Sequence, residues 1–389
     1  MGAYIVRRLL LIVPTLFGIM LINFALTQFV PGGPIEQIIA RVEGNANVFE
    51  GIAGGGDAGG EAPQDNGGGG GDSGYAGARG LPQEFLRELE VQMGFSRVVC
   101  EEGYTGERAL DAPECTTEPI GIAERFAIMI GNYVTFDFGE SYFQSKPVVD
   151  LVLEKMPVSI TLGLWSTLLA YAISLPMGIR KAVRDGTAFD SWTSGLIIVG
   201  YAIPGFLFAI LLLVLFAGGS YYQVFPLRGL TSDNFDQLSL IGKVGDYFWH
   251  ITLPVVASTI SSFATLTLLT KNSFLDEIKK QYVITARAKG LAERGVLWGH
   301  VFRNAMLIVI AGFPGLFIAV FFGSSIIIET IFSLDGLGRL GFEAAVARDY
   351  PVIFATLYVF GLIGLLVGLL SDLMYVFVDP RIDFESREV

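Results

Sequence analysis

The segment ITARAKGLAERG, residues 284–295, is polar, basic and broken by a glycine. It lies between two stretches that are apolar enough to cross a bilayer, residues 248–270 and 304–328. Of the whole chain, 52% is hydrophobic and only 16% is charged, which is typical of membrane proteins. A short basic segment between two such stretches predicts a loop at one face of a membrane.

The chain contains six stretches that are long enough to span a membrane as helices. About 20 residues at roughly 1.5 Å each cover a hydrocarbon core of about 30 Å. The six stretches are residues 9–30, 158–179, 193–217, 248–270, 304–328 and 352–378. The predicted fold is therefore an all-α membrane protein with six transmembrane helices. Asp372 lies inside the sixth stretch, where it is expected to cap backbone groups or to pair with Arg381; a proton relay is the alternative. Pro204-Gly205 and Pro314-Gly315 should bend their helices.

Lysines and arginines near the ends of the spans predict the orientation of the chain. With the N-terminus inside, the inner face carries most of them, from Arg7 and Arg8 to the cluster in residues 271–303. The two shorter outer loops hold only Arg228, Lys243, Arg339 and Arg348. Both termini and the opening segment are therefore expected in the cytoplasm.

A long insertion, residues 31–155, is predicted on the periplasmic side between the first two helices. Its part 51–80 is almost half glycine and should form a flexible linker, because it cannot bury a core. The patterns LPQEFLRELEVQMGF and AERFAIMIGNYV have helical spacing, which makes the insertion α-rich. The insertion also contains Cys100 and Cys115, which are expected to form a disulfide in an oxidising periplasm; two free thiols are the alternative.

The predicted organisation has four parts. They are residues 1–30 with the first helix, the insertion 31–155, a membrane core 156–380 that includes the cytoplasmic loop 271–303, and a cytoplasmic tail 381–389. Within the loop, a helix over 276–289, a break at Gly290 and a second helix over 291–303 are expected. Ala286 and Gly290 lie four residues apart and would mark one surface with few side chains, where another protein could press closely. A basic loop that only fixes orientation or touches anionic lipid is the alternative.

Motifs for catalysis and metal binding are missing from the sequence. It has two histidines, His250 and His300, and no HExxH, CxxC, GxSxG or GxxxxGK[ST] pattern. We therefore predict no catalytic residue, no metal ligand, no cofactor bound by this chain and no ATPase activity of its own. Ser258, Ser262 and Thr265 share one face of the fourth span and are candidates for a translocation path. Hydroxyls that bond to their own helix are the alternative.

Several longer stretches resemble one known family. YVITARAKGLAERGVLWGHVFRNAML resembles the cytoplasmic coupling motif of ABC importer permeases, in which a helix–turn–helix fits a cleft on the ATPase subunit. MGAYIVRRLLLIVPTLFGIMLINF, ETIFSLDGLGRLGFEAAVARDYPV and the terminal DPRIDF are similar to the dipeptide/oligopeptide branch of that family. GGPIEQIIARVEG and SLDGLG look most like the Yej-type microcin C/oligopeptide subgroup. Ile284, Ile308 and Asp335 depart from the usual pattern, which leaves the substrate open.

The resemblance implies a transmembrane permease subunit of an ATP-driven, binding-protein-dependent importer of peptides or peptide-like compounds, in the inner (plasma) membrane of a bacterium. It implies a second permease subunit as heterodimer partner, cytoplasmic ABC ATPases that hold ATP and Mg, and a periplasmic peptide-binding protein; nucleic acid is not an expected partner. The residues expected to couple the chain to the ATPases are Thr285, Ala286, Arg287, Lys289, Gly290, Glu293 and Arg294. A permease for nickel or another small solute, or a stand-alone secondary transporter, remains the alternative.

Overall fold

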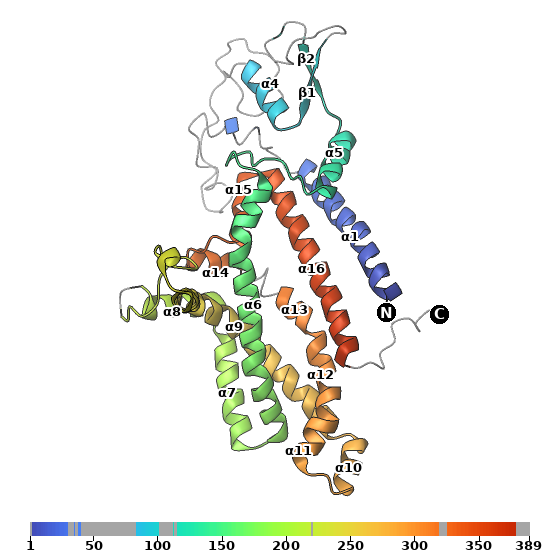
Figure 1. Cartoon of the computed structure of the whole chain (residues 1–389), viewed down its shortest axis with the longest axis vertical. Helices are drawn as coiled ribbons and strands as arrows, with labels where there is room; N and C mark the ends of the chain where they lie inside the picture. The colour runs from blue at the N-terminus through green and yellow to red at the C-terminus, as the bar shows by residue number, and fades with distance from the viewer. Residues whose placement is uncertain are drawn as a thin grey trace, which may run out of the picture. The chain divides into compact units, whose positions relative to one another are not determined.

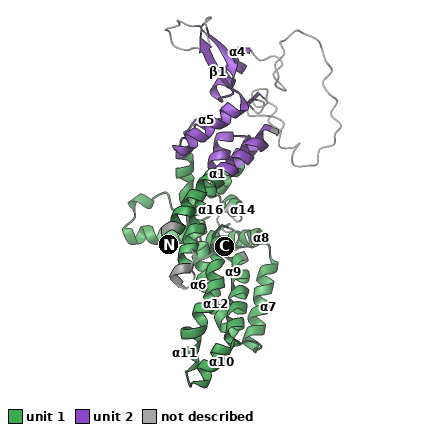
Figure 2. Ribbon diagram, turned by 90° about the vertical axis from the view of Figure 1, so that its right-hand side faces the viewer, with its two compact units in different colours: residues 1–16, 151–342, 358–389 green, residues 17–150, 343–357 purple. Residues whose placement is uncertain are grey.

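The computed structural model describes residues 2–29, 35, 38–39, 83–100, 112, 115–218, 221–318 and 325–378. The predicted linker 51–80 and the tail 381–389 lie outside these residues. Figure 1 labels the helices and strands along the chain, and Figure 2 shows the two compact units into which the chain divides. Unit 1 comprises residues 1–16, 151–342 and 358–389, and unit 2 comprises residues 17–150 and 343–357.

The described part of the chain is mainly helical, as the apolar stretches predict. Four helices are long and apolar enough to cross a membrane: Tyr4–Gln28 in α1 (Gly2–Phe29), α6 (Val148–Val183), Glu293–Ile318, and Tyr350–Met374 in α16 (Tyr350–Val378). Two bent pairs also pass, α7 (Ala188–Ala202) with α8 (Gly205–Phe216) at 91°, and the two parts of α9 (Leu240–Ile278) at 53°. By length and composition, the described part of the chain thus has four helices that could cross a membrane, or up to six if each bent pair is one span.

The sharp bend between α7 and α8 lies where the sequence predicts it. Ile203 and Pro204 separate the two helices, and Pro204 caps the start of α8. Proline lacks a backbone N–H and its ring clashes with the preceding turn, so it stops one helix and is well suited to begin the next.

Unit 1 has α9 at its centre, beside α7, α8 and α12 (Phe302–Ala311) (Figure 2). A Cβ on Gly178 of α6 would lie 2.6 Å from Cβ of Thr270 in α9, so this close approach of the two helices needs a glycine. Ser174 of α6 also donates a hydrogen bond of 3.1 Å to the carbonyl oxygen of Phe263. Small and hydroxyl-bearing residues let apolar helices pack at short range.

Glu329 fixes a second part of unit 1. It lies in α14 (Ser325–Ile331) and is fully buried, and its carboxylate accepts hydrogen bonds from Ser159 of α6 and from the backbone N–H of Arg339 in α15 (Leu337–Ala347). Ser159 in turn accepts from the N–H of Leu337. A Cβ on Gly336 would lie 2.2 Å from the Glu329 carboxylate. The first glycine of SLDGLG therefore leaves room for the buried carboxylate that holds α15 to α6.

Unit 2 contains a strand pair that the helical patterns did not predict. Helix α4 (Gln83–Gln92) leads into strand β1 (Ser96–Cys100), which pairs antiparallel with β2 (Cys115–Pro119), and α5 (Ile122–Val134) follows. The register sets Ser96 opposite Pro119 and Cys100 opposite Cys115, and a disulfide joins the two cysteines. Ile35 and Ile39 pack with Leu86, Leu89 and Met93 in a small core. The predicted α-rich insertion therefore has its two helices, but it also contains two strands that the sequence patterns did not predict.

Candidate functional site

The predicted coupling segment forms a helix, a turn and a second helical stretch in unit 1. Helix α10 (Gln281–Ala288) ends in a turn at Gly290, after which come α11 (Glu293–Val296), a π-helical turn over Leu297–Val301, and α12. The first helix begins at Gln281 rather than at Asp276, because Asp276 belongs to the last turn of α9. The second helix begins at Glu293 rather than at Leu291, and it continues through the π-helical turn into α12 as one helix, Glu293–Ile318.

Glu277 at the end of α9 explains why the chain breaks before α10. It forms an ion pair with Lys280 and accepts a hydrogen bond of 2.7 Å from the Tyr282 hydroxyl. That hydroxyl also accepts a bond of 3.1 Å from the Asn304 amide of α12. Burial, with the Glu277 carboxylate, raises the pKa of Tyr282. One carboxylate therefore holds the turn that joins α9 to α10.

Gly290 ends α10 in the conformation that favours glycine. Its φ is +82°, and its N–H donates to the carbonyl of Arg287, while the N–H of Leu291 donates to that of Ala286. These two bonds are the Schellman arrangement, in which a left-handed residue after the helix satisfies the last free carbonyls. No atom lies within 4 Å of the position of a Cβ at Gly290, so the conformation, and not crowding, selects glycine here.

The inner side of the segment is part of a buried core that also includes the ends of the spanning helices. Val283 and Ala286 of α10 and Val296 of α11 are buried in a cluster with residues of the long helices. The cluster's other members include Ile179 and Ala182 of α6, Phe274 of α9, and Ala305 and Val309 of α12. A displacement of the turn would thus be passed directly to α6, α9 and α12, because close-packed cores have low compressibility.

Ala286 lies on the inner side, which corrects the predicted surface. Its side chain is 7% exposed and packs within the chain, so it does not form an outer patch with Gly290. Small residues such as alanine and glycine are suited both to a docking surface and to a closely packed core. In this structure Ala286 is packed in the core. All residues around the turn from Arg287 to Gly295 are exposed.

The charged residues of the segment differ in their partners. Arg287 and Glu293 form an ion pair across the turn, with Nε and Oε1 2.9 Å apart. The Thr285 hydroxyl donates to the carbonyl of Gln281 in its own helix. Among the described residues, Lys289 and Arg294 make no ion pair, and both are exposed. Arg287 and Glu293 thus stabilise the turn, and Lys289 and Arg294 present charge at its surface.

A buried ion cluster joins three helices beside this segment. The Nζ atom of Lys181, fully buried in α6, lies 2.9 Å from the Asp190 carboxylate of α7 and donates to the hydroxyls of Thr193 and Ser194. Lys271 of α9 contacts the same carboxylate at 2.7 Å and Asp185 at 2.9 Å. The sequence gives no signal for the contact between Lys271 and Asp190, because these residues lie 81 positions apart in the chain.

The three candidates for a translocation path do not share one environment. Ser258 is buried and donates a hydrogen bond of 2.9 Å to the carbonyl oxygen of Pro254 in its own helix. Ser262 is half-buried, and Thr265 is exposed. The bond of Ser258 matches the alternative interpretation of these hydroxyls. Asp372 pairs with Arg8 at 2.9 Å and accepts from the Tyr4 hydroxyl, both in α1, and the predicted partner Arg381 lies outside the described residues.

Comparison with known proteins places these features in a family. Residues 174–384 match the family described as "Binding-protein-dependent transport system inner membrane component". The chain is 57% identical over 390 residues to the "Peptidoglycan transport system permease protein YejB" of Agrobacterium fabrum, with 100% of both chains covered. It is 56% identical, again over 100% of both chains, to the "Inner membrane ABC transporter permease protein YejB" of Escherichia coli O157:H7. It is 29% identical to the "Oligopeptide transport system permease protein AppB" of Bacillus subtilis, over 99% of this chain and 100% of that one.

The match to the family covers the core in which the coupling segment, the ion cluster and the buried Glu329 all lie. The similarity to the two YejB proteins covers the whole chain, so it also includes the residues before residue 174. This agrees with the resemblance seen in the sequence motifs. The chain belongs to the family of inner membrane components of binding-protein-dependent transport systems, and it is the permease of such an ABC importer.

Proposed function

We propose that this chain is one of two different membrane-spanning subunits of an ATP-driven importer of peptides or peptide-like compounds. In this proposal six spans, two of them bent, cross the bacterial inner membrane, and both termini are cytoplasmic. Residues 31–155 lie in the periplasm, where a peptide-binding protein delivers the solute. The full-length relatives whose names refer to peptidoglycan or oligopeptide transport support this class of substrate.

The observation that carries the proposal is the exposed turn at Gly290 on a core shared with the long helices. Cytoplasmic ATPases, which hold ATP and Mg, would contact Lys289, Gly290, Glu293 and Arg294. Thr285 and Arg287 support the turn from the side, and Ala286 supports it from beneath. When the ATPases close, the turn moves, and the buried cluster passes the movement to α6, α9 and α12. The two-state change between inward-facing and outward-facing arrangements is then mechanical.

The ion cluster gives this movement a route to α7. Lys181, Asp190 and Lys271 connect the ends of α6 and α9 to the first turn of α7 through two ion pairs, and the contact of Lys271 is also a charge-assisted hydrogen bond. Such bonds are shorter and stronger than neutral ones, and here they are shielded from solvent. We therefore include α7 among the helices that move with the coupling segment.

The proposed function is tested by purifying the chain with its natural partners and assaying uptake in vesicles. ATPase subunits and a second permease should co-purify, and uptake of a labelled oligopeptide should need both ATP and the binding protein. Uptake of nickel in place of peptide would contradict the proposed substrate. A chain that purifies alone and transports with a proton gradient would contradict the proposed class of transporter.

A further inference from the structure

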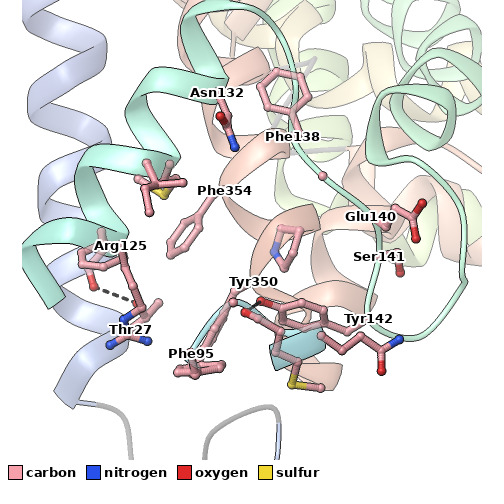
Figure 3. A pocket seen from close by; sticks show the side chains of 18 of the residues that line it. Thr27, Phe95, Arg125, Asn132, Phe138, Glu140, Ser141, Tyr142, Tyr350 and Phe354 are labelled. Carbon is pink, nitrogen blue, oxygen red and sulfur yellow. Dashed lines mark hydrogen bonds between the residues drawn. The ribbon is translucent and has the colours of Figure 1, made fainter. Parts of the chain in front are cut away.

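Unit 2 contains a cavity of about 710 Å³ that has no part in the coupling of the chain to ATPases (Figure 3). Its walls come from α1, the turn between α4 and β1, α5, the loop that follows α5, and the start of α16. The volume falls within the range of about 300–1,000 Å³ that is usual for small-molecule sites. Aromatic rings form much of the lining, among them Phe95, Phe138, Tyr142, Tyr350 and Phe354.

One side of the cavity carries a cation that is held in place. The Arg125 guanidinium lies over the ring of Phe95, with its Cζ atom 4.7 Å from the ring centroid. Its Nη2 atom donates a hydrogen bond of 3.0 Å to the side-chain oxygen of Gln28 in α1. Ring stacking and this bond orient the planar fork of the guanidinium, which matches the geometry of a carboxylate.

The other side of the cavity carries carboxylates. Figure 3 shows Glu140 and Ser141 across the cavity from Arg125 and Thr27, and Asp137 also contributes to the lining. The loop that carries them is fixed: Ser141 donates a bond of 2.5 Å to Asp349, and the Tyr142 hydroxyl donates one of 3.1 Å to the carbonyl oxygen of Met93. The lining of this aromatic cavity thus includes a cation and, at its open edge, two exposed carboxylates.

We propose that this cavity binds a short peptide with free termini, with the peptide's carboxylate at Arg125 and its ammonium at Glu140 and Asp137. The rings between them accept apolar or aromatic side chains. The assignment of peptide as ligand rests on the proposed function. An anionic lipid or a fatty acid fits less well, because Glu140 and Asp137 would repel its negative charge.

The test uses the full-length importer complex in nanodiscs, without the binding protein. The probe is the tripeptide Ala-Phe-Ala, compared with its C-amidated and its N-acetylated form. Arg125→Gln should weaken binding of the free tripeptide by between about tenfold and a hundredfold, the usual range for a charged hydrogen-bonded pair. C-amidation of the tripeptide should weaken its binding to the unaltered protein to the same extent. In Arg125→Gln, amidation should have little further effect, whereas N-acetylation should still weaken binding.

The converse variant and two controls complete the design. Glu140→Gln should reduce the effect of N-acetylation, because Asp137 remains, and it should keep the effect of amidation. Arg97→Gln removes an equal charge from unit 2 at an exposed ion pair with Glu124 and should leave binding unchanged. Arg125→Lys keeps the charge and loses the planar fork, so it should retain part of the affinity and the response to amidation, which guards against a folding defect in Arg125→Gln.

Three outcomes would overturn the assignment. They are undetectable tripeptide binding, an effect of amidation that persists undiminished in Arg125→Gln, and tight occupancy by co-purified lipid that the tripeptide cannot displace. Uptake by the complete importer separates this result from the proposed function. Peptide uptake with an empty cavity contradicts only the cavity site, whereas ATP-driven uptake of a different solute contradicts the proposed function itself.

Discussion

Gly290 has a backbone conformation that an L-residue adopts only at a cost. Its φ of +82° lies in the left-handed region, where a Cβ costs roughly 1–2 kcal/mol. The space around it is open, so substitutions separate the two effects of a side chain at this site. Alanine adds backbone strain alone, and tryptophan adds the same strain together with bulk on the outer surface of the turn.

We predict that Gly290→Trp reduces uptake to background and removes the ATPase subunits from the purified complex. Gly290→Ala should keep the ATPases bound, because strain of this size leaves the buried core of the segment in place. Arg294→Gln should also have a smaller effect than Gly290→Trp. An exposed ion pair between Arg294 and an ATPase subunit would contribute at most about 1 kcal/mol. Uptake in vesicles and co-purification measure these outcomes.

Gly186→Trp is the matched control for this variant. Gly186 also has a positive φ, of +73°, in the exposed turn between α6 and α7, and it too has open space around it. This control should insert normally and keep its ATPases. A Gly290→Trp complex with bound ATPases and substrate-stimulated hydrolysis would show that the segment only fixes orientation.

At the scale of elements, the ion cluster makes the stability of three helices depend on one carboxylate. Asp190 pairs with both Lys181 and Lys271, so its loss leaves two cations without their shared partner. We predict that Asp190→Asn lowers the free energy of unfolding by about 3–5 kcal/mol, the usual cost of breaking a buried pair. Lys181→Met should cost less, because Lys271 still neutralises Asp190. Chemical unfolding in detergent measures both.

Lys279→Met is the control for the ion cluster. Lys279 is exposed at the end of α9, so its loss should change stability by no more than about 0.5 kcal/mol. The double variant Lys181→Met with Asp190→Asn should cost less than the sum of the two single variants, because the residues share one interaction. Additive costs would mean that the pair contributes nothing beyond the packing of each side chain.

The strand pair of unit 2 gives a prediction about its cysteines. Cys100 and Cys115 stand opposite each other in the register of β1 and β2, and a bond closes the segment between them. Mass spectrometry of a digest made without reductant should find one linked peptide pair. In the chain-entropy model, closing a loop of about 15 residues contributes on the order of 3 kcal/mol, here local to this unit. Alkylation of both cysteines before any reduction would contradict this prediction.

At the scale of the whole molecule, the sequence predicts what depends on short stretches of chain. Spanning helices follow from apolar character over about 20 residues, and the bend at Pro204 and the break at Gly290 follow from single residues with restricted or special backbone preferences. Strands β1 and β2, with five residues each, are too short to stand out from a loop in one sequence.

The partners of Lys181 and Glu329, and the inward side of Ala286, could not be predicted in this way. Each depends on which helices become neighbours. Glu329 meets Ser159 from a distant part of the chain, and Asp190 receives Lys271 in the same manner. The cavity of unit 2 is a stronger example, because its lining comes from five separate segments. Sites assembled from distant residues are determined by the fold, and a local pattern does not show them.

The glycine-rich part of the insertion connects two segments that pack together in unit 2, and the effect of its length can be tested. Ile35 and Ile39 on one side, and Leu86, Leu89 and Met93 on the other, share one core. Residues 40–82 between them lie outside the described residues. Because both ends of this segment are held by packing, its length should matter only through the entropy of closing it, which changes by about 0.6 kcal/mol for each doubling.

We therefore predict that deletion of Gly67–Gly71 leaves uptake near normal, as measured in the same vesicles as the Gly290 variants. Ile39→Ala is the matched comparison, because it changes a single residue but removes buried atoms from the core, at a cost of about 2–5 kcal/mol. It should lower the thermal stability of unit 2 far more than the loss of five glycines. A deletion variant that inserts correctly but transports nothing would mean that the glycines make a specific contact, and length alone would then no longer describe this segment.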